Sequence, residues 1–559
     1  MKFCAFLLAI VALAPVGAWA QGVIPTNNPT IFSQQPVQAT GSTTPRTLAT
    51  RAADVMHAAD WGVVCDGSTD NSSAISNMMA NEPTTGATII FPPGTCVDSG
   101  YIQISISGTV VEGAAGSNST ILSRPAPPGQ PLIYLDDTGS LTNVTVKNLT
   151  LQETGTTSTS DFAILAEGQY NNFSGLTITG FGRAIVNNAS ITTYSNNSIS
   201  VPPTSSAIGI LEQNIGGQNI FFNNTITSLH STSENSIGFS IISGSADEFI
   251  FNEVESLNVA MSVQPATGSA VYSAILISNE FDHANTSALT LNGTAGSIQR
   301  MTISDNWFSS TYSGSGLFIE GDVEGLHIST SEFYLNAYDG ITISAGSNVE
   351  SFLLENSMLG GNSGNGITVG NNVSNFSLIG NVMGPSAGFT GNAYPYYITG
   401  PTNNNIIISG NNTIGNTNGP FNGSTGTGIT IIGNNDTLGN QLQGGLTVDG
   451  IALATTPNVA TLGTNPPVSG TAYQWTGPGT LQLACPITLN PTSTAAATAA
   501  LNIGATSTPA SQIDYASRPD TLTAADGEIV TLRAEVPAGW YDEITVTNAT
   551  IGTCVAVVH

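Results

Sequence analysis

The feature that most constrains the fold of this chain is a short motif that recurs at nearly constant spacing. The motif consists of an Asn (once a Ser), any residue and an apolar residue. It appears nine times, at intervals of 25 to 28 residues. A fixed period of this length is typical of a solenoid, in which each repeat buries its apolar side chains against its neighbours. The nine motifs are Asn171-x-Phe173, Asn197-x-Ile199, Asn224-x-Ile226, Asn252-x-Val254, Asn279-x-Phe281, Asn306-x-Phe308, Ser331-x-Phe333, Asn356-x-Met358 and Asn381-x-Met383.

Within one period, short runs such as Leu289–Leu291 and Met301–Ile303 place apolar residues at every second position. This alternation predicts strands of three to five residues, and clusters such as Asn292–Gly296 supply the tight corners between them. Turns stacked in register form parallel ladders roughly 4.8 Å apart and place equivalent Asn side chains above one another. We therefore predict an all-β fold, a right-handed single-stranded parallel β-helix, whose hand follows the rule for parallel crossovers.

The N-terminal residues and the charge balance indicate where the protein works. Residues 1–20 combine Lys2, an apolar run from Phe3 to Val16 and a small-residue ending, which predicts a cleaved signal peptide. We expect a secreted protein, extracellular or periplasmic, without an integral membrane span, because no later stretch approaches eighteen apolar residues. The net charge of −28 argues against nucleic acid as a partner, since that requires clustered Lys and Arg.

The remaining chain divides by composition. Residues 21–52 are rich in Thr, Pro, Gln and Asn and predict a flexible linker. Residues 53–451 form the β-helix, opened by a short helix that Asp70 caps, and a longer excursion after Gly384 carries Tyr394, Tyr396 and Tyr397. Residues 452–470 predict a second linker, and residues 471–559 a small C-terminal β-sandwich, through which we consider a homotrimer.

Four cysteines remain once the signal peptide is removed: Cys65, Cys96, Cys485 and Cys554. In an exported chain they predict two disulfides, for which three pairings are open. Because two cysteines lie near each end of the mature chain, we expect Cys65 to pair with Cys96 and Cys485 with Cys554.

The first structured segment carries two runs, DWGVVCDGSTDN at residues 60–71 and IIFPPGTC at residues 89–96. Together they resemble the opening of the pectate-lyase superfamily, which includes rhamnogalacturonase-like and epimerase-like proteins and phage tailspikes, and we assign this opening to residues 53–125. Cys65 and Cys96 replace the usual glycine and tyrosine, which supports their pairing, and Asn71 replaces an acid. The resemblance implies a β-helix that acts on or binds polysaccharide, but no particular reaction.

The repeat also predicts a candidate site. If the Asn faces its ladder and the apolar residue faces the core, the residue between them and the residue after them face solvent. In four consecutive coils these outward residues are mostly acidic and aromatic, and we call them, with one adjoining His, the acidic strip. Its members are Glu253, Glu255, Glu280, Asp282, Trp307, Glu332, Tyr334 and His283.

Carboxylates one and two coils apart lie roughly 5 and 10 Å apart at the backbone, which brackets the separations that glycosidases use. We predict Glu280 and Asp282 as the central catalytic pair, with Glu253 and Glu332 as catalytic neighbours. Crowding of like charges would raise one pKa, as a general acid requires. Trp307 offers a face for a sugar ring, and Tyr334, Glu255 and His283 are predicted to contact the substrate.

Other interpretations of the strip stay open. The acids could serve solubility alone, or they could hold Ca²⁺, which takes six to eight oxygens; we predict no other cofactor and no dedicated metal site. A polysaccharide lyase would need a cation beside its base, and the only basic residues of the predicted helix are Arg124, Lys147, Arg183 and Arg300. The sequence therefore favours a secreted glycoside hydrolase, with a non-catalytic glycan-binding or tailspike-like structural protein as the alternative and a calcium-assisted lyase as a second one.

Overall fold

The computed structural model describes most of the chain beyond residue 44. The described residues are 36–37, 45–114, 120–124, 130–136, 140–155, 161–203, 206–213, 216–229, 235–385, 390–418, 422–423, 427–432, 434, 446–448, 451–453, 469–470, 472–474, 480–490, 496–518, 528–537, 539–551 and 554–558. The predicted signal peptide lies outside them. Among them, no helix is long and apolar enough to cross a membrane.

The chain forms two units, residues 1–56 and 57–559. In the first, β1 (Pro36–Val37) pairs antiparallel with β2 (Arg46–Thr47), and α2 (Leu48–Ala52) follows. Part of the segment expected to be a linker therefore has regular structure. β3 (Val55–His57) spans the boundary between the units.

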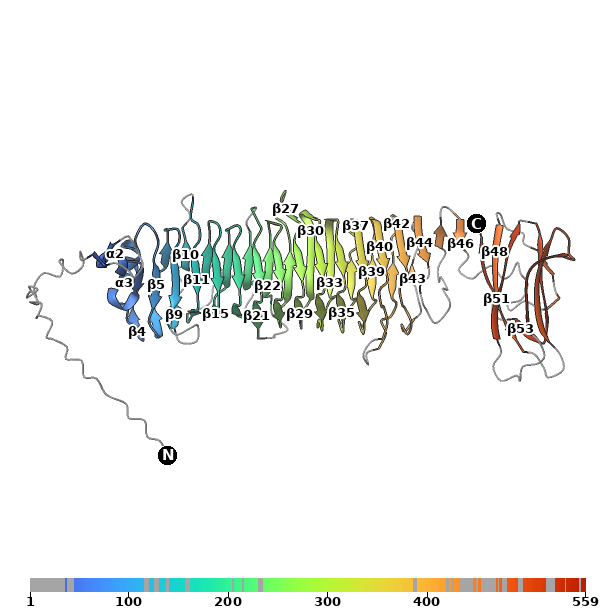
Figure 1. The fold of residues 1–559 in the computed structure, drawn as a ribbon, viewed down its shortest axis with the longest axis horizontal. Helices are drawn as coiled ribbons and strands as arrows, with labels where there is room; N and C mark the ends of the chain where they lie inside the picture. The colour runs from blue at the N-terminus through green and yellow to red at the C-terminus, as the bar shows by residue number, and fades with distance from the viewer. Residues whose placement is uncertain are drawn as a thin grey trace, which may run out of the picture. The chain divides into compact units, whose positions relative to one another are not determined.

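The second unit is dominated by a parallel β-solenoid, as predicted (Figure 1). One of its sheets has twelve strands, one per coil, and every neighbouring pair in it is parallel. We call it the twelve-strand sheet. Its members are β4 (Asp66–Asp70), β6 (Gly94–Val97), β9 (Thr120–Arg124), β12 (Thr150–Glu153), β15 (Thr177–Thr179), β18 (Ser198–Val201), β21 (Thr225–Ser228), β25 (Glu253–Glu255), β29 (Glu280–Asp282), β32 (Trp307–Ser309), β35 (Glu332–Tyr334) and β38 (Met358–Gly360).

The other strands of each coil belong to one larger parallel sheet, which bends round the rest of the coil. Its strands in the first half of the solenoid are β5 (Thr88–Phe91), β7 (Ile102–Ile104), β8 (Val110–Gly113), β10 (Pro131–Leu135), β11 (Thr145–Lys147), β13 (Phe162–Ala166), β14 (Asn172–Ser174), β16 (Arg183–Asn187), β17 (Thr193–Ser195), β19 (Ile208–Glu212), β20 (Ile220–Phe222), β22 (Ile237–Ile241), β23 (Gly244–Ser245) and β24 (Glu248–Ile250). Those in the second half are β26 (Val259–Val263), β27 (Ala270–Tyr272), β28 (Ile275–Ile277), β30 (Ser287–Gln299), β31 (Thr302–Ser304), β33 (Leu317–Glu324), β34 (His327–Ser329), β36 (Ile341–Ile343), β37 (Asn348–Glu355), β39 (Ile367–Val369), β40 (Val373–Ile379), β41 (Tyr396–Ile398), β42 (Asn404–Ser409), β43 (Asn422–Gly423) and β44 (Thr427–Ile432).

The predicted Asn ladder runs through the interior beside the twelve-strand sheet. Asn252 Nδ2 donates to Asn279 Oδ1 (2.9 Å), and Asn279 Nδ2 donates to Asn306 Oδ1 (2.8 Å). The same oxygens accept the backbone N–H of the preceding Asn, at 2.9 and 2.8 Å. Each amide therefore satisfies buried backbone and side-chain groups together, which explains why Asn recurs at this corner.

Two of the nine motifs were assigned wrongly. Asn171 belongs to another corner, where its Oδ1 accepts the N–H of Val144, and the ladder position beneath Asn197 is occupied by Leu176, only 21 residues earlier. Near the other end, Ser357 rather than Asn356 occupies the ladder, since its Oγ accepts the N–H of Ser331. Asn356 is exposed, and Leu359 rather than Met358 enters the core.

A second ladder, which was not predicted, lies at the next corner of the later coils. Asn336 Nδ2 donates to Asn362 Oδ1 (2.9 Å), which is repeated between Asn362 and Asn392 (3.0 Å) and between Asn392 and Asn416 (3.2 Å). These asparagines are spaced by 24 to 30 residues, so the period alone did not reveal them.

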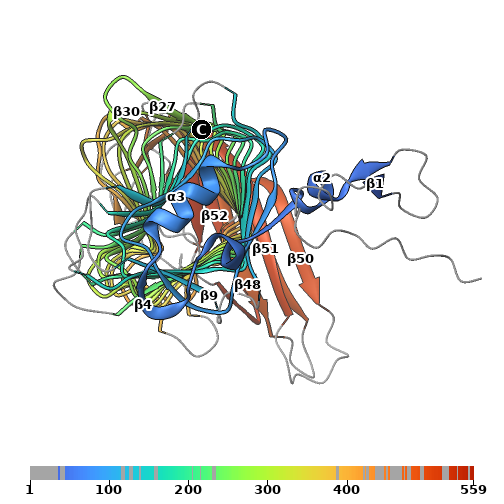
Figure 2. The same cartoon turned by 90° about the vertical axis from the view of Figure 1, so that its left-hand side faces the viewer.

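The N-terminal end of the solenoid is covered by α3 (Ser72–Ala80), which contacts β7 and the short helix η1 (Ala58–Trp61) (Figure 2). The helix buries Ile75 and Met78. Its N-cap position is Asn71 rather than the predicted Asp70. Asp70 accepts the N–H of Ser72 (3.1 Å), and hydrogen bonds from Ser99 help to lower the pKa of Asp70 to about 2.

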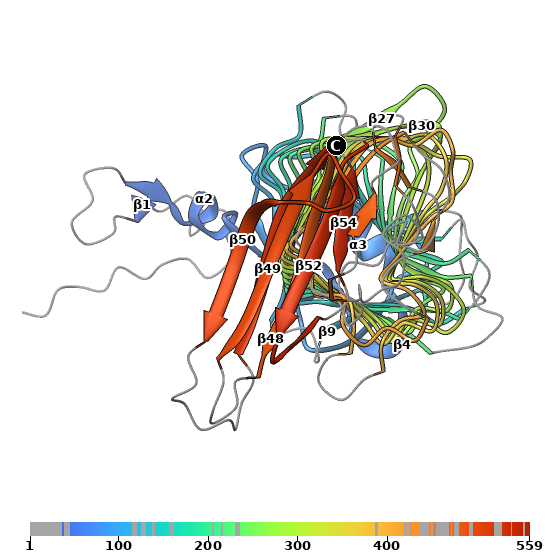
Figure 3. The ribbon, with the colours of Figure 1, turned by 90° about the vertical axis from the view of Figure 1, so that its right-hand side faces the viewer.

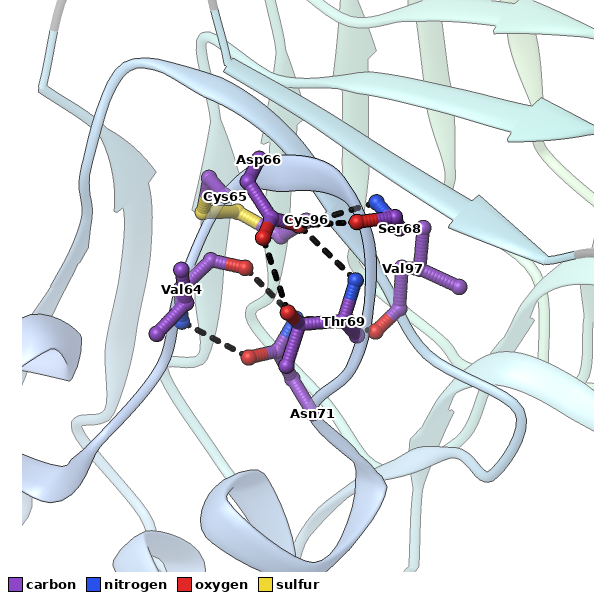
Figure 4. The surroundings of a disulfide bond; sticks show 8 residues. All are labelled: Val64, Cys65, Asp66, Ser68, Thr69, Asn71, Cys96 and Val97. Atoms are coloured by element: carbon purple, nitrogen blue, oxygen red, sulfur yellow. Dashed lines mark hydrogen bonds between the residues drawn. A yellow bond between two sulfur atoms is a disulfide. The ribbon is translucent and has the colours of Figure 1, made fainter.

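The Cys65–Cys96 disulfide is present beside this cap, as predicted (Figure 4). The same view explains why an amide at Asn71 suits this chain. Asn71 Nδ2 donates to the carbonyls of Val64 (3.0 Å), Thr69 (2.8 Å) and Val97 (3.0 Å), while its Oδ1 accepts the N–H of Val64 (2.7 Å). A carboxylate has no protons for the three carbonyls.

Beyond the coils, β45 (Leu446–Val448) and β46 (Ile451–Leu453) pair antiparallel, so the predicted helix boundary at residue 451 falls within a hairpin. The C-terminal residues form two antiparallel sheets, as expected for a small sandwich (Figure 3). One contains β47 (Ala472–Gln474), β52 (Tyr541–Thr547), β49 (Ala497–Gly504) and β50 (Ser511–Arg518); the other contains β51 (Glu528–Pro537), β48 (Thr480–Leu489), β53 (Ala549–Ile551) and β54 (Val555–Val558). Both sheets contribute to one apolar core, which holds the predicted Cys485–Cys554 disulfide.

The Asn ladder predicts a stability effect. Asn279→Ala removes the acceptor of two Asn252 donors and the donor to the Phe249 carbonyl, so we expect the unfolding free energy to fall by about 3 kcal/mol. Asn348→Ala removes an exposed amide that donates to Asp322 and should change the unfolding free energy by less than about 0.5 kcal/mol. Urea denaturation followed by circular dichroism measures both, and equal losses would contradict the buried role of the ladder.

A second prediction concerns Asp542 in the sandwich, which is buried and whose carboxyl oxygens have no hydrogen-bond partner within the described residues. Burial raises the pKa of Asp542 to about 7. The native state then binds a proton that the unfolded state loses near pH 4, so stability falls as pH rises from about 4 to about 7. Asp542→Asn should remove this loss, roughly 2–4 kcal/mol above pH 7.

Thermal denaturation between pH 4 and pH 9 measures the effect, with Glu535→Gln, which replaces an exposed carboxylate on β51, as the control. An unchanged pH dependence in Asp542→Asn would contradict the assignment.

Candidate functional site

The acidic strip lies on the outer face of four adjacent strands, β25, β29, β32 and β35. In the position before the core residue, Glu253, Glu280, Trp307 and Glu332 are in register from coil to coil. In the position after it, Glu255, Asp282, Ser309 and Tyr334 are in register. All eight predicted residues therefore lie together, seven on these strands and His283 directly after β29.

The strip faces outward because the residues between its two rows are buried. Phe281, Phe308 and Phe333 are fully buried, and their rings stack at centroid distances of 5.3 and 4.7 Å. Because side chains alternate along a strand, this aromatic column directs both neighbours of each Phe away from the core. The phenylalanines and the Asn ladder together fix the orientation of the strip.

Glu280 is the central acid of the strip. Its coil neighbours in register are Glu253 and Trp307, and Asp282 lies two residues along the same strand. Partial burial and the negative charges of Glu253 and Asp282 raise the pKa of Glu280, while His283 acts in the opposite direction. The surroundings of Glu280 thus favour the protonated form of its carboxyl group.

Asp282 is held by two neighbours. One carboxylate oxygen accepts the Ser309 hydroxyl and the other lies 2.5 Å from His283 Nδ1. His283 occupies the left-handed region, with φ of 53°, at the corner that follows β29. This conformation turns the imidazole back onto the preceding carboxylate, and the ring also lies 5.9 Å from that of Tyr312. Asp282 is therefore fixed in orientation.

Trp307 and Tyr334 form the aromatic part of the strip. Their ring centroids are 5.2 Å apart with planes inclined by 33°, and Trp307 is 39% exposed. Partial burial, with the charges of Glu332, Asp282 and Glu280, raises the pKa of Tyr334 to about 12, so its hydroxyl remains a donor at neutral pH. Glu332 lies beyond Trp307, two coils from Glu280, roughly 10 Å away at the backbone.

Two residues beside the strip were not predicted. Ser309 is buried and holds Asp282, and Tyr312 lies beside His283. Ser309 occupies an outward position of the repeat, but a small hydroxyl gave no sign of a contact. Tyr312 lies in a turn outside the repeated motif and depends on the path of that turn.

No group of three or more His, Cys, Asp or Glu side chains among the described residues is arranged to hold a metal ion. The described Lys and Arg residues of the solenoid lie away from the strip: Arg124 is buried on β9, Lys147 pairs with Glu112 (2.8 Å), Arg300 lies over the Tyr272 ring, and Arg183 lies over the Phe162 ring. The strip is therefore a carboxylate and aromatic surface that contains no Lys or Arg.

Comparison with known proteins agrees with the architecture. The family described as rhamnogalacturonase A/epimerase, pectate lyase-like, matches residues 55–281. No curated protein matches the sequence significantly.

Among solved structures, tailspike protein 3 of bacteriophage CBA120 has a TM-score of 0.51 at 13% identity, and the alignment covers 74% of this chain and 65% of the tailspike. This chain therefore spans slightly less than two thirds of the tailspike's length. The catalytic unit of an α-1,3-glucanase of family GH87 from Streptomyces thermodiastaticus has a TM-score of 0.43 at 14% identity, covering 67% of this chain and 68% of that one. The surface adhesin PfbA of Streptococcus pneumoniae has a TM-score of 0.42 at 11% identity, covering 64% and 91%.

The tailspike shares the fold, and the family match runs from the cap as far as β29, the ninth strand of the twelve-strand sheet. The protein is a parallel β-helix whose residues 55–281 match the pectate lyase-like family.

Proposed function

We propose that this protein is an exported glycoside hydrolase that cleaves a neutral or lightly charged polysaccharide on the acidic strip. The observation that carries the proposal is the pairing of Glu280, whose pKa is raised, with Asp282, whose orientation is fixed two residues away on the same strand. A general acid and a second carboxylate in distinct surroundings are the pair that glycoside hydrolysis requires.

In this mechanism Glu280 protonates the glycosidic oxygen as the bond from that oxygen to the anomeric carbon breaks. Asp282 takes a proton from a water molecule, whose oxygen forms the new bond to the anomeric carbon on the opposite face of the sugar. Residues two apart on a strand are separated by roughly 6.6 Å along the backbone. This spacing supports the inverting arrangement, in which a water molecule fits between the carboxyl groups.

The charges around the pair support a neutral substrate. Glu253, Glu255 and Glu332 surround it, and a uronate would meet these carboxylates without a Lys or Arg in the strip to balance its charge. Trp307 and Tyr334 present ring faces on which the apolar face of a sugar can stack. The same lack of a cation weighs against a lyase reaction, which must stabilise an enolate.

The fold and the disulfides support an exported, polysaccharide-active protein. The family match names rhamnogalacturonase A and epimerases, and the two disulfides suit an oxidising compartment. An exported hydrolase combines these features with the carboxylate pair of the strip.

The proposal predicts that release of reducing ends from a panel of purified neutral polysaccharides depends on the pair. Glu280→Gln and Asp282→Asn should each lower kcat by at least about 100-fold while polysaccharide binding is kept. Glu248→Gln, which removes the same charge on β24 outside the strip, should retain activity. Binding by the unaltered protein without any release of reducing ends would instead establish the non-catalytic glycan-binding alternative.

A further prediction concerns pH. A general acid must be protonated, so activity should fall as pH rises through the pKa of Glu280. Because the charge of Glu253 raises that pKa, Glu253→Gln should shift the alkaline limb of the kcat/KM profile to lower pH. The profile of Glu248→Gln should match that of the unaltered protein; an unshifted limb in Glu253→Gln would show that Glu280 is not the acid.

A further inference from the structure

A groove of about 380 Å³ lies on another face of the solenoid, over β36, β39 and β41. Its lining includes Tyr338, Thr342, Asn365, Thr368, Tyr394 and Tyr397. None of these residues belongs to the acidic strip. Two of them, Tyr394 and Tyr397, come from the tyrosine-rich excursion after Gly384, which has no role in the proposed hydrolysis.

The groove is hollow because one row of outward side chains, in register across the larger sheet, contains small residues. Phe318, Thr342, Thr368 and Tyr397 occupy successive coils in register, all half-buried on the outer face. Two threonines between two aromatic residues leave a depression two coils long, roughly 10 Å from strand spacing. The two Thr side chains therefore lie in the floor of the groove, whose lining continues through Tyr397 to Asn422 of the next coil.

Tyrosines also stand beside this floor, in the turns before β36 and β41. Tyr338 is 60% exposed, yet its backbone is held on both sides: its N–H donates to the Gly314 carbonyl (3.0 Å), and its carbonyl accepts the Gly364 N–H (2.8 Å). A Cβ at Gly364 would lie 3.0 Å from that carbonyl and 2.4 Å from Asp339 Oδ1, so this close approach requires glycine. Tyr338 is thus presented to solvent from a fixed backbone.

The polar groups of the groove form a fixed network. The buried Asp339 carboxylate accepts the Thr342 hydroxyl (2.8 Å) and the Asn365 N–H (2.7 Å). Asn365 Nδ2 in turn donates to Thr368 Oγ1 (3.0 Å). Because the Thr342 proton goes to Asp339, the Ser315 hydroxyl donates to Thr342 Oγ1 (2.7 Å). Thr342 therefore keeps one acceptor lone pair, and Thr368 retains its hydroxyl proton as a donor. The single carboxylate of the lining is turned inward and engaged.

Rigid aromatic faces beside alternating hydroxyl donors and acceptors match the chemistry of a sugar ring, which has apolar C–H faces and a rim of hydroxyl groups. No Lys or Arg lines the groove to balance a carboxylate or phosphate of a ligand, and no free acid faces it to bind a cation. We propose that this groove is a second binding site, specific for neutral oligosaccharide and separate from the acidic strip.

The groove lies one corner away from the strip along the chain. Tyr334 on β35 belongs to the strip, and the turn of residues 335–340 that follows it carries Tyr338 to the groove. A neutral glycan held here would be kept close to the strip, but binding in the groove does not require the strip to be catalytic.

The experiment uses the full exported chain carrying Glu280→Gln and Trp307→Ala, which removes the proposed hydrolysis and the stacking surface of the strip. This parent protein is titrated by calorimetry with neutral glucan hexasaccharides of α-1,3, α-1,4, β-1,3 and β-1,4 linkage and with hexagalacturonate. We expect at least one neutral hexasaccharide to bind and hexagalacturonate not to. Tyr338→Ala with Tyr397→Ala should weaken that binding at least about tenfold, since two ring contacts are lost. Tyr170→Ala, which removes an equally exposed tyrosine of the solenoid, is the matched control and should leave the affinity unchanged.

A second variant tests the groove without removing its tyrosines. Thr368→Phe fills the depression with a ring next to that of Tyr397. We expect this variant to keep the native circular dichroism and melting temperature. Its affinity for the neutral hexasaccharide should nevertheless fall at least about tenfold. The proposal is overturned if no neutral hexasaccharide binds, or if Thr368→Phe binds as tightly as its parent. These binding results would stand even if the protein proved to have no hydrolase activity.

Discussion

The structure depends on one constraint, which is that each coil must satisfy the backbone groups of the next in register. Strand pairing does this along the sheets, and the Asn ladders do it at the corners, where each Oδ1 accepts both the N–H and the side-chain amide of the preceding coil. A buried amide without a hydrogen-bond partner destabilises the fold by more free energy than a formed hydrogen bond adds. A shift of one residue in the register between coils would therefore lower the stability at every coil. The cap on the first coil follows the same logic, with Asn71 binding three carbonyls and the Cys65–Cys96 disulfide beside it.

That register also produces the acidic strip. Residues 27 positions apart in the chain become neighbours one strand spacing apart, so that Glu253, Glu280 and Asp282 share one surface. Mutual repulsion among these carboxylates destabilises the fold locally, and the same repulsion raises the pKa of Glu280. The buried phenylalanine column supplies the packing that holds the like charges together. The side chains that stabilise the interior and the acids of the strip are therefore alternate residues of the same strands.

The two proposed glycan surfaces differ in how the coils make them. The strip arises where outward side chains are large and charged, whereas the groove arises where two outward threonines are smaller than the aromatic residues above and below them. The strip carries five carboxylates, while the only acid of the groove is buried and hydrogen-bonded. A neutral glycan suits both surfaces, because neither offers a cationic Lys or Arg to an anionic one.

The sequence by itself determined the β-helix, the six ladder positions from Asn197 to Ser331, both disulfides and the membership of the acidic strip. This was possible because the coils between these residues are nearly equal in length. Residues at a constant spacing in the sequence therefore occupy the same position in successive coils and point the same way. Where coil length changes, only the tertiary structure decided which residues meet. Leu176 rather than Asn171 lies beneath Asn197, Ser357 displaces Asn356, and turns of unequal length bring Tyr338 and Tyr394 to one groove. Burial likewise depends on three-dimensional packing, which is why the contact of Ser309 with Asp282 and the raised pKa of Asp542 had no signature in the chain.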